Sequence, residues 1–396
     1  MDGKYLMRPC WLEIDLDAIK SNYQALRDMV GPQVTVMPAI KANAYGHGIV
    51  EVAKALEECN AEYLALGVLQ EAIQVRESGV KSPIMLFINN TITEVADLYV
   101  RYDLMPTVRT IRQVEAMAKA AGGKTVKVFI KLETGRGRLG IPAGEVAQFV
   151  KDILAFPNIQ IEGMYSHLTA PDWPDKESYS RIQAEIFSKA VEEITALGVT
   201  IPFLQLANSS GSIAIPEIRM TAICPGQCMW GYSTVEERPG HPKLKNAIVA
   251  WKSQLVDVKE VEYGKFGENF AAVKLDRPKR IGVIVGGLSD GISALQAKGG
   301  SVLVRGKRVP VASSLCVEHT IIDLSDVPDA AIGDEVVILG EQGDEKITFW
   351  DLLKTWNRNV PEFLVCLPSR LHRVYIKDGK KQKITWTNKS QAIIEE

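Results

Sequence analysis

The stretch VTVMPAIKANAYGHG, from Val34 to Gly48, joins a short apolar run to a glycine-punctuated turn and places Lys41 between them. The run has the β-branched and apolar composition of a buried strand. The segment that follows, Ile49–Cys59, has helical spacing. The sequence therefore predicts a strand, a turn and a helix in succession, with Lys41 where the strand ends.

The same succession recurs through the first half of the chain. Seven further apolar runs alternate with helical segments, which makes eight predicted strands. These runs are YLALGV (63–68), PIMLF (83–87), LMPTV (104–108), VKVFIKLE (126–133), IQIEGMYSH (159–167), FLQLANS (203–209) and TAICPG (221–226). Eight strand–helix units in about 200 residues favour a (β/α)8 barrel, because open parallel sheets usually have fewer strands.

After Tyr232 the pattern changes to short β-rich runs separated by close turns, with one helical segment near Phe349–Trp356. We therefore predict an α/β protein with two domains, a TIM-like (β/α)8 barrel over residues 1–240 and an all-β domain over residues 241–396.

Composition excludes several classes of function. The 396 residues carry a formal net charge of -2, without the basic stripe that binds a phosphate backbone, so we expect no nucleic-acid partner. No segment approaches the apolar length of a membrane span, and the N-terminus lacks a signal-peptide core. The six cysteines are scattered and the five histidines show no ligand spacing, so we expect a cytoplasmic protein without a metal site or membrane contact.

Lys41 lies at the end of a predicted strand. In (β/α)8 barrels the functional groups are found at the carboxyl ends of the strands. A partly desolvated lysine forms Schiff bases with aldehydes such as pyridoxal phosphate. Barrels often bind phosphate after strands seven and eight, and here those strands end in Asn208-Ser209-Ser210-Gly211 and Pro225-Gly226-Gln227. A surface lysine followed by ordinary turns would give the same local pattern.

A competing motif is GRGRLG, Gly135–Gly140, which matches the dinucleotide fingerprint and is followed by Glu162 at about the spacing of a ribose contact. Two arginines occupy positions where the backbone would have to approach a pyrophosphate, and the motif lies in the fifth strand–helix unit of eight. The dinucleotide interpretation is therefore the weaker one.

Taken together, the ordered motifs resemble those of the alanine racemase family of fold-type III pyridoxal-phosphate enzymes. The motifs that carry the resemblance are KANAYGHG (41–48), ETGRGRLG (133–140), MYSHL (164–168), ANSS (207–210), VEYG (261–264), GLSDG (287–291) and SSLCVEHT (313–320). The resemblance runs in order from about residue 10 to about residue 375. It implies a (β/α)8 barrel followed by a β-domain, in a homodimer whose subunits share their active sites.

The resemblance also implies roles for individual residues in binding pyridoxal 5'-phosphate. Lys41 would carry the cofactor as a Schiff base and act as one catalytic base. The phosphate would be held by Tyr45, Ser209 and the backbone at Gly226 and Gln227, with Asn208 in the same turn.

A second group of residues would act on the substrate. Tyr263 would be the second base, reaching the opposite face of the cofactor from the partner subunit, with His167 beside the cofactor tuning it. Arg138 would bind the substrate carboxylate. Lys131 would orient that arginine and is often carbamylated in the family.

The sequence departs from the family pattern at four places, the last of which spans two adjacent residues. Cys224 replaces the arginine that contacts the cofactor ring nitrogen. Leu288 and Ser369 replace tyrosines that narrow the substrate pocket and its entrance, so a wider pocket is expected. Val317 replaces a methionine near the substrate carboxylate, and Glu318 follows it in place of an aspartate.

The sequence therefore predicts a pyridoxal-phosphate-dependent amino-acid racemase that acts on alanine or a larger amino acid by a two-base mechanism. Two alternatives remain open at this point. One is a fold-type III aldolase or dehydratase acting on 3-hydroxy amino acids, and the other is a cofactor-binding protein without racemase activity.

Overall fold

The computed structural model describes residues 8–87, 91–169, 177–261, 279–292, 300–312, 316–386 and 390–393. The chain divides into two compact units. The barrel unit comprises Ala18–Ala44 and Gly48–Lys245. The β unit comprises Met1–Asp17, Tyr45–His47 and Asn246–Glu396.

Eight parallel strands form the wall of the barrel unit within the described residues. In chain order they are β2 (Thr35–Val36), β3 (Leu64–Leu66), β4 (Ile84–Leu86), β5 (Leu104–Val108), β6 (Val126–Glu133), β8 (Ile159–Tyr165), β9 (Phe203–Gln205) and β10 (Ala222–Ile223). Each coincides with one of the eight predicted runs. The (β/α)8 prediction is confirmed.

The barrel closes where the first strand meets the second. Strands β2 and β10 are paired in parallel, and Ala39, just beyond β2, forms a parallel bridge with Ala65 of β3. The amide of Ala65 donates to the Pro38 carbonyl, and the amide of Ile40 donates to the Ala65 carbonyl. Lys41 follows this closing bridge directly.

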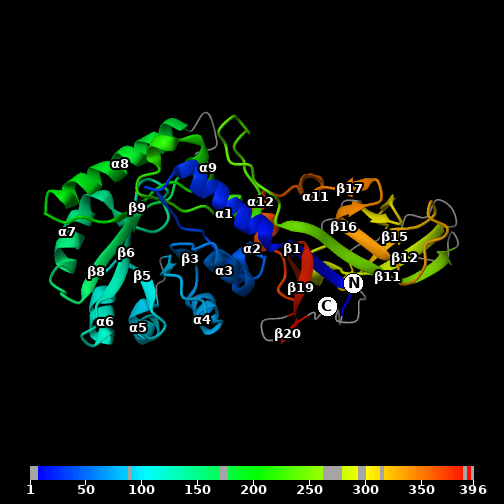
Figure 1. Ribbon diagram of the computed structural model, residues 1–396, viewed down its shortest axis with the longest axis horizontal. Coiled ribbons are helices and arrows are strands. Elements are labelled where there is room, and N and C mark those ends of the chain that lie inside the picture. Colours follow the sequence, from blue (N-terminus) through cyan, green and yellow to red (C-terminus); the bar gives the residue numbers. More distant parts are fainter. Residues whose placement is uncertain are drawn as a thin grey trace. The chain divides into compact units, whose positions relative to one another are not determined.

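Helices alternate with the strands and lie outside them, as Figure 1 shows for α4 to α8. Those of the barrel region are α1 (Leu16–Val30), α2 (Lys41–Tyr45), α3 (Ile49–Glu58), α4 (Leu69–Glu77), α5 (Ile92–Arg101), α6 (Ile111–Ala121), α7 (Ala143–Ile153), α8 (Glu177–Thr195) and α9 (Ser209–Ala214). The short elements are β7 (Ile141–Pro142), which pairs with β6, and the 3-10 turns η2 (Pro216–Ile218) and η3 (Gln227–Trp230).

Inward-facing side chains fill the barrel. The buried cluster consists of Met37, Ala39, Ala65, Met85, Met105, Phe129, Tyr165, Phe203, Ala222 and Cys224. Phe129 and Phe203 pack edge to face with ring centroids 5.4 Å apart. Gly163 makes room for this packing, since a Cβ there would lie 2.4 Å from the Phe129 ring. The barrel interior is a packed core, and chemistry is confined to its rim.

The β unit contains a large, mostly antiparallel sheet. Its strands are β1 (Cys10–Asp15), β11 (Ile248–Val261), β12 (Lys279–Val285), β13 (Ser301–Val304), β14 (Lys307–Pro310), β15 (His319–Asp323), β16 (Glu335–Gln342), β17 (Glu345–Ile347), β18 (His372–Lys377), β19 (Lys380–Trp386) and β20 (Ser390–Ile393). Its helices are α11 (Phe349–Trp356), α12 (Val360–Val365) and the 3-10 turn η4 (Leu288–Asp290). The single helix expected near Phe349–Trp356 is α11, while α12 was not anticipated.

The N-terminal segment is predicted to belong to the barrel domain, residues 1–240. In the structure, Met1–Asp17 belongs to the β unit instead. Strand β1 pairs antiparallel with β11 and parallel with β18, so it lies inside the sheet of the β unit (Figure 1). Its side chains are buried from Cys10 to Ile14, a pattern that requires cover on both faces. Sequence order alone places this strand with the barrel that follows it, whereas pairing places it with strands more than 200 residues away.

In the described part of the chain, no helix has the length and apolar character needed to cross a membrane.

Candidate active site

Lys41 begins a left-handed turn at the rim of the barrel. Ala42, Asn43, Ala44 and Tyr45 all have positive φ, between 50° and 55°. Such a conformation costs about 1–2 kcal/mol per residue for residues with a Cβ, so the surroundings must hold it in place. The predicted strand end at Lys41 is therefore a strained turn rather than a plain loop.

Glu71 of α4 holds the first part of the turn. Its carboxylate accepts hydrogen bonds from the amides of Asn43 at 2.6 Å and Ala42 at 3.2 Å. The Asn43 side chain in turn accepts from the Ile49 amide at 2.9 Å, at the start of α3. The turn that carries Lys41 is thus fixed by side-chain acceptors in addition to the backbone bond from the Ala44 amide to the Ile40 carbonyl at 2.9 Å.

The amine of Lys41 lies in a partly apolar environment. Its Nζ is 5.0 Å from the centre of the Phe87 ring, and Gly67 packs so closely that an added Cβ would lie 3.2 Å from the Lys41 Cβ. Burial lowers the pKa of Lys41, and the positive charge of Arg138 lowers it further. A lowered pKa favours the neutral, nucleophilic amine that covalent catalysis requires.

Other titratable groups share this end of the barrel. Burial lowers the pKa of Lys131, on β6, to about 8, and Arg138 adds to the effect. Burial also lowers the pKa of His167, just after β8, to about 3, with further contributions from Arg138 and Lys41. The structure therefore brings together Lys41, Lys131, Arg138 and a neutral His167, and the positive charges of the lysine and arginine side chains suit anionic groups.

Glu133 shapes the loop that presents Arg138. Its carboxylate accepts hydrogen bonds from the amides of Gly135 at 2.6 Å, Gly137 at 3.1 Å and Arg138 at 3.1 Å. Arg136 points elsewhere, because its Nη1 donates to the Thr169 carbonyl at 2.6 Å. The glycine-rich loop Gly135–Gly140 therefore folds around the carboxylate of Glu133.

Buried polar contacts join this loop to the one after β8. Gln183 of α8 donates to the Thr134 hydroxyl at 3.0 Å and to the His167 carbonyl at 3.2 Å, and accepts from the Thr169 amide at 3.0 Å. The Thr134 hydroxyl also lies 2.8 Å from that of Ser166. Helix α8 thereby helps to position the loop that carries Arg138 and the loop that carries His167.

The position of Glu162 contradicts the dinucleotide interpretation, in which this carboxylate would contact a ribose next to the loop Gly135–Gly140. Glu162 accepts from the Tyr63 hydroxyl at 2.5 Å and pairs with Lys127 at 3.0 Å. Tyr63 precedes β3 and Lys127 is the second residue of β6, so Glu162 lies toward the amino-terminal ends of the strands. The loop at Gly135–Gly140 follows the carboxyl end of β6, at the opposite end of the barrel.

The turns after β9 and β10, which the sequence assigns to phosphate binding, contact each other. The Ser209 hydroxyl accepts from the Gly226 amide at 2.9 Å and from the Cys228 amide at 3.3 Å. Asn208 caps α9 by accepting from the Gly211 amide at 3.0 Å. Gln227 begins η3, next to Gly226. The Gly226 amide, expected to face a ligand, is already paired within the protein.

Cys224 is part of the buried cluster inside the barrel. Burial raises the pKa of its thiol to about 12, while the positive charge of Lys41 acts in the opposite direction. The thiol is therefore neutral at physiological pH. It lies close enough to Lys41 for each group to influence the other's ionisation.

Tyr45 closes the left-handed turn and belongs to the β unit. The two residues after it are anchored there, since Arg373 donates to the Gly46 carbonyl at 2.8 Å and Tyr375 donates to the His47 carbonyl at 3.0 Å. Tyr263, the expected second base, lies outside the described residues.

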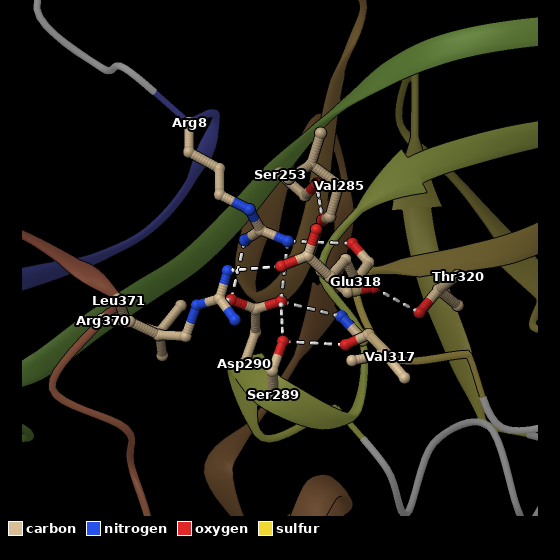
Figure 2. A network of polar contacts seen from close by, with 12 residues as sticks. Arg8, Ser253, Val285, Ser289, Asp290, Val317, Glu318, Thr320, Arg370 and Leu371 are labelled. Carbon is tan, nitrogen blue, oxygen red and sulfur yellow. Dashed lines mark hydrogen bonds and ion pairs between the residues drawn. The ribbon is translucent and has the colours of Figure 1, made fainter.

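Two of the expected pocket residues meet in the β unit. The Leu288 amide donates to the Cys316 carbonyl at 2.9 Å, next to Val317. The side chains of Leu288 and Val317 are 37% and 61% exposed, so both are available for contact. Ser369 is also exposed and precedes Arg370, which pairs with Glu318 at 2.7 Å (Figure 2).

Sequence reasoning missed the residues that shape these segments. Glu71, Glu133 and Gln183 act through backbone groups, and such contacts leave no periodic or spacing signal. Asp290 lies inside the quoted GLSDG motif, but nothing in the sequence shows that it is fully buried and paired with Arg8. Only the folded chain reveals these pairs.

The fold and the site together define a barrel enzyme with a desolvated lysine at its rim, among cations suited to an anionic cofactor or substrate. Two family models match the chain. They are described as "Alanine racemase, N-terminal domain", over residues 14–234, and "Alanine racemase, C-terminal domain", over residues 248–375. The chain therefore belongs to the alanine racemase family, which makes it an isomerase of the pyridoxal-phosphate-dependent racemase class.

Individual relatives agree along nearly the whole chain. Alanine racemase of Halothermothrix orenii is 32% identical over 378 residues, covering 94% of this chain and 98% of the relative. Alanine racemase 1 of Clostridium acetobutylicum is 33% identical over 384 residues, covering 96% and 98%.

Solved structures of the family have the same fold. Alanine racemase of Clostridium difficile 630 superposes with a TM-score of 0.89 at 26% identity, covering 96% of this chain and 99% of that one. The Bacillus anthracis enzyme with bound L-Ala-P superposes with a TM-score of 0.87 at 29% identity, covering 96% and 98%.

Proposed function

We propose that this chain interconverts the L and D forms of an amino acid, alanine or a larger one, by a two-base mechanism in a homodimer with shared active sites. The observation that carries the proposal is the position of Lys41. Its amine has a lowered pKa and stands on a fixed turn within a group of cations at the carboxyl ends of the barrel strands.

The residues at this rim fit pyridoxal 5'-phosphate. Lys41 would hold the cofactor covalently, and the turns at Ser209 and Gly226–Gln227, with Tyr45, would hold its phosphate. Cys224 would face the ring nitrogen as a neutral, weak hydrogen-bonding partner, which agrees with the raised pKa of its thiol. When bound, the cofactor supplies an electron-withdrawing ring that stabilises negative charge on the substrate Cα.

Inversion at a carbon atom needs proton removal on one face and proton delivery on the other. Lys41 would exchange the proton on one face at its Nζ. Tyr263 of the partner subunit would exchange it on the opposite face at its hydroxyl. His167, whose neutral ring adds no charge to the site, would tune Tyr263.

Arg138 would bind the substrate carboxylate. Its guanidinium is exposed at the end of the loop wound around Glu133, so it is presented outward. Lys131 would orient Arg138. With a pKa of about 8, the Lys131 amine is partly neutral near physiological pH and can take up carbon dioxide as a carbamate anion, which would pair with the guanidinium.

The side-chain pocket would be wider than in a racemase with tyrosines at its entrance. Leu288 and Ser369 are exposed and occupy two such positions, and Val317 is exposed beside Leu288. Each additional methylene accepted by an apolar pocket contributes about 1 kcal/mol. Amino acids larger than alanine are therefore expected substrates.

The proposal is tested by incubating the purified holoenzyme with single L-amino acids in deuterium oxide, followed by chiral chromatography and mass spectrometry. Racemisation with incorporation of one deuterium at Cα is the expected result. Release of glycine and an aldehyde from a 3-hydroxy amino acid would indicate an aldolase instead. Cofactor binding with no α-hydrogen exchange for any amino acid would indicate a binding protein.

A further inference from the structure

The turn that displays Leu288 is joined to the segment that displays Val317 by backbone contacts. The amides of Gly286, Leu288 and Ser289 donate to the carbonyls of Glu318, Cys316 and Val317, at 2.8, 2.9 and 3.0 Å. The Ser289 hydroxyl adds a bond to the Val317 carbonyl at 2.8 Å. We call these two segments, Gly286–Gly291 and Cys316–Glu318, the paired rim.

The two segments of the paired rim are in direct backbone contact. A Cβ added to Gly287 would lie 2.4 Å from the Cys316 carbonyl oxygen and 2.6 Å from the Val317 carbonyl carbon. Any rotation of the turn therefore also displaces Val317. The backbone contacts therefore hold the two exposed apolar side chains of the paired rim in one arrangement.

Asp290 is the charged centre of the paired rim. Its carboxylate is completely buried and accepts two hydrogen bonds from Arg8, at 2.7 and 2.9 Å, and one from the Gly287 amide at 3.0 Å (Figure 2). Arg370 Nε lies 3.5 Å from the same carboxylate. A buried carboxylate needs such partners, because an unpaired charge is strongly disfavoured out of water.

Arg8 connects the two segments. Besides its bonds to Asp290 in one segment, its Nη2 donates to the Glu318 carbonyl at 2.9 Å in the other. One planar guanidinium thus binds both the turn of Leu288 and the segment of Val317. A single ammonium cannot reproduce this set of bonds.

We propose that Arg8 is a positioning residue for substrate selection: through Asp290 and the Glu318 carbonyl it holds Leu288 and Val317 in the arrangement that determines which amino-acid side chains are accepted. This inference rests on the proposed function, in which Leu288 and Val317 line the substrate pocket. It assigns to the N-terminal segment, far in sequence from Asp290 and Glu318, a role in specificity.

The test compares Arg8→Ala, Arg8→Lys and Asp290→Asn with wild-type holoenzyme. Arg305→Ala is the matched control, because Arg305 also forms ion pairs in the β unit, with Asp329 and Asp334, without contacting the rim. Steady-state kinetics with alanine and with leucine give the ratio of the two kcat/KM values. Amide hydrogen exchange of peptides covering 286–292 and 316–323 measures the local stability of the paired rim independently of enzymatic activity.

Arg8→Ala is expected to change the leucine-to-alanine ratio at least about fivefold and to accelerate exchange in both peptides at least about tenfold. The Lys variant is expected to recover part of each effect, and the Arg305 control to stay within about twofold of wild type. Bound-cofactor absorbance is expected to stay unchanged in all variants. Should Arg8→Ala fail to fold, Arg8→Lys and the isosteric Asp290→Asn give the same two measurements.

Unchanged exchange in the rim peptides of Arg8→Ala and Asp290→Asn would overturn the positioning role. Faster exchange with an unchanged substrate ratio would overturn the role in selection. A wild-type enzyme that racemises no amino acid would overturn the proposed function, and the role of Arg8 in substrate selection with it. The hydrogen-exchange measurement would still show whether Arg8 holds the paired rim in place.

Discussion

The Ser209 hydroxyl accepts a hydrogen bond from the Gly226 amide at 2.9 Å, which ties the turn after β9 to the turn after β10. The backbone bond from the Cys224 amide to the Ala207 carbonyl, at 2.9 Å, also joins the two segments, and the Ser209 contact extends this pairing into the turns. It places a buried hydroxyl and the start of a 3-10 turn side by side at the end of the barrel where phosphate groups are bound in this architecture.

Ser209→Ala is expected to weaken cofactor binding by about tenfold, because the phosphate would lose the Ser209 hydroxyl as a hydrogen-bonding partner, a contact worth about 1–1.5 kcal/mol. Spectrophotometric titration of the apoenzyme with pyridoxal phosphate measures the change. Ser212→Ala is the control, since that hydroxyl also lies in α9 but donates to the Ser209 carbonyl. Equal affinity in the Ser209 variant and wild type would contradict the assignment.

Lys41→Ala is expected to fold and to lose at least several orders of magnitude in kcat, since it removes a covalent catalyst. Borohydride reduction of the wild-type holoenzyme should fix the cofactor on the peptide that contains Lys41, as mass spectrometry will show. Lys131→Ala serves as the control and should still be labelled at Lys41. Label on any other lysine would rule out Lys41 as the attachment site.

Tyr263→Phe is expected to retain cofactor colour and to lose nearly all racemisation, because only the hydroxyl is removed. Both directions must lose the same factor in kcat/KM, since the equilibrium between enantiomers is fixed. Mixing Lys41→Ala and Tyr263→Phe subunits should restore part of the activity, as one site of each heterodimer would be intact. Absence of recovery after verified subunit exchange would argue against a site shared between subunits.

Carbamate formation on Lys131 should depend on pH. A pKa lowered to about 8 means that the neutral amine, the form that reacts with carbon dioxide, increases as the pH rises from about 7 to about 9. Carbon-13 NMR of the enzyme in labelled bicarbonate should show a carbamate signal that grows over this range and is lost in Lys131→Ala. A signal that persists in the variant belongs to another amine.

Leu288→Tyr combined with Ser369→Tyr is expected to shift the ratio of kcat/KM values toward alanine, because the two rings refill the entrance that the wild-type residues leave open. The measurement is kcat/KM for alanine and for larger amino acids in both enzymes. A wild-type preference for alanine of about a hundredfold or more, or roughly 3 kcal/mol, would show that the pocket is already closed by other residues.

The sequence by itself determined the repeated strand–helix pattern and therefore the barrel. Period and turn signals are local, so eight runs could be found in order and Lys41 could be placed at the end of the first. The meeting of the turns after strands seven and eight could be anticipated as well, because a barrel brings the ends of these strands together whatever their side chains. The short β-rich runs and close turns after Tyr232 likewise predicted the β unit.

Only the tertiary structure decided what holds these groups. The left-handed turn at Ala42–Tyr45 depends on a carboxylate from α4, and the Leu288 turn depends on Arg8, 282 residues away from Asp290 in the chain. Strand β1 joins the β unit because its partners are β11 and β18, not the helices that follow it. Such contacts join residues with no common period or spacing, and burial, which lowers the pKa of Lys41 and raises that of Cys224, exists only once the chain has folded.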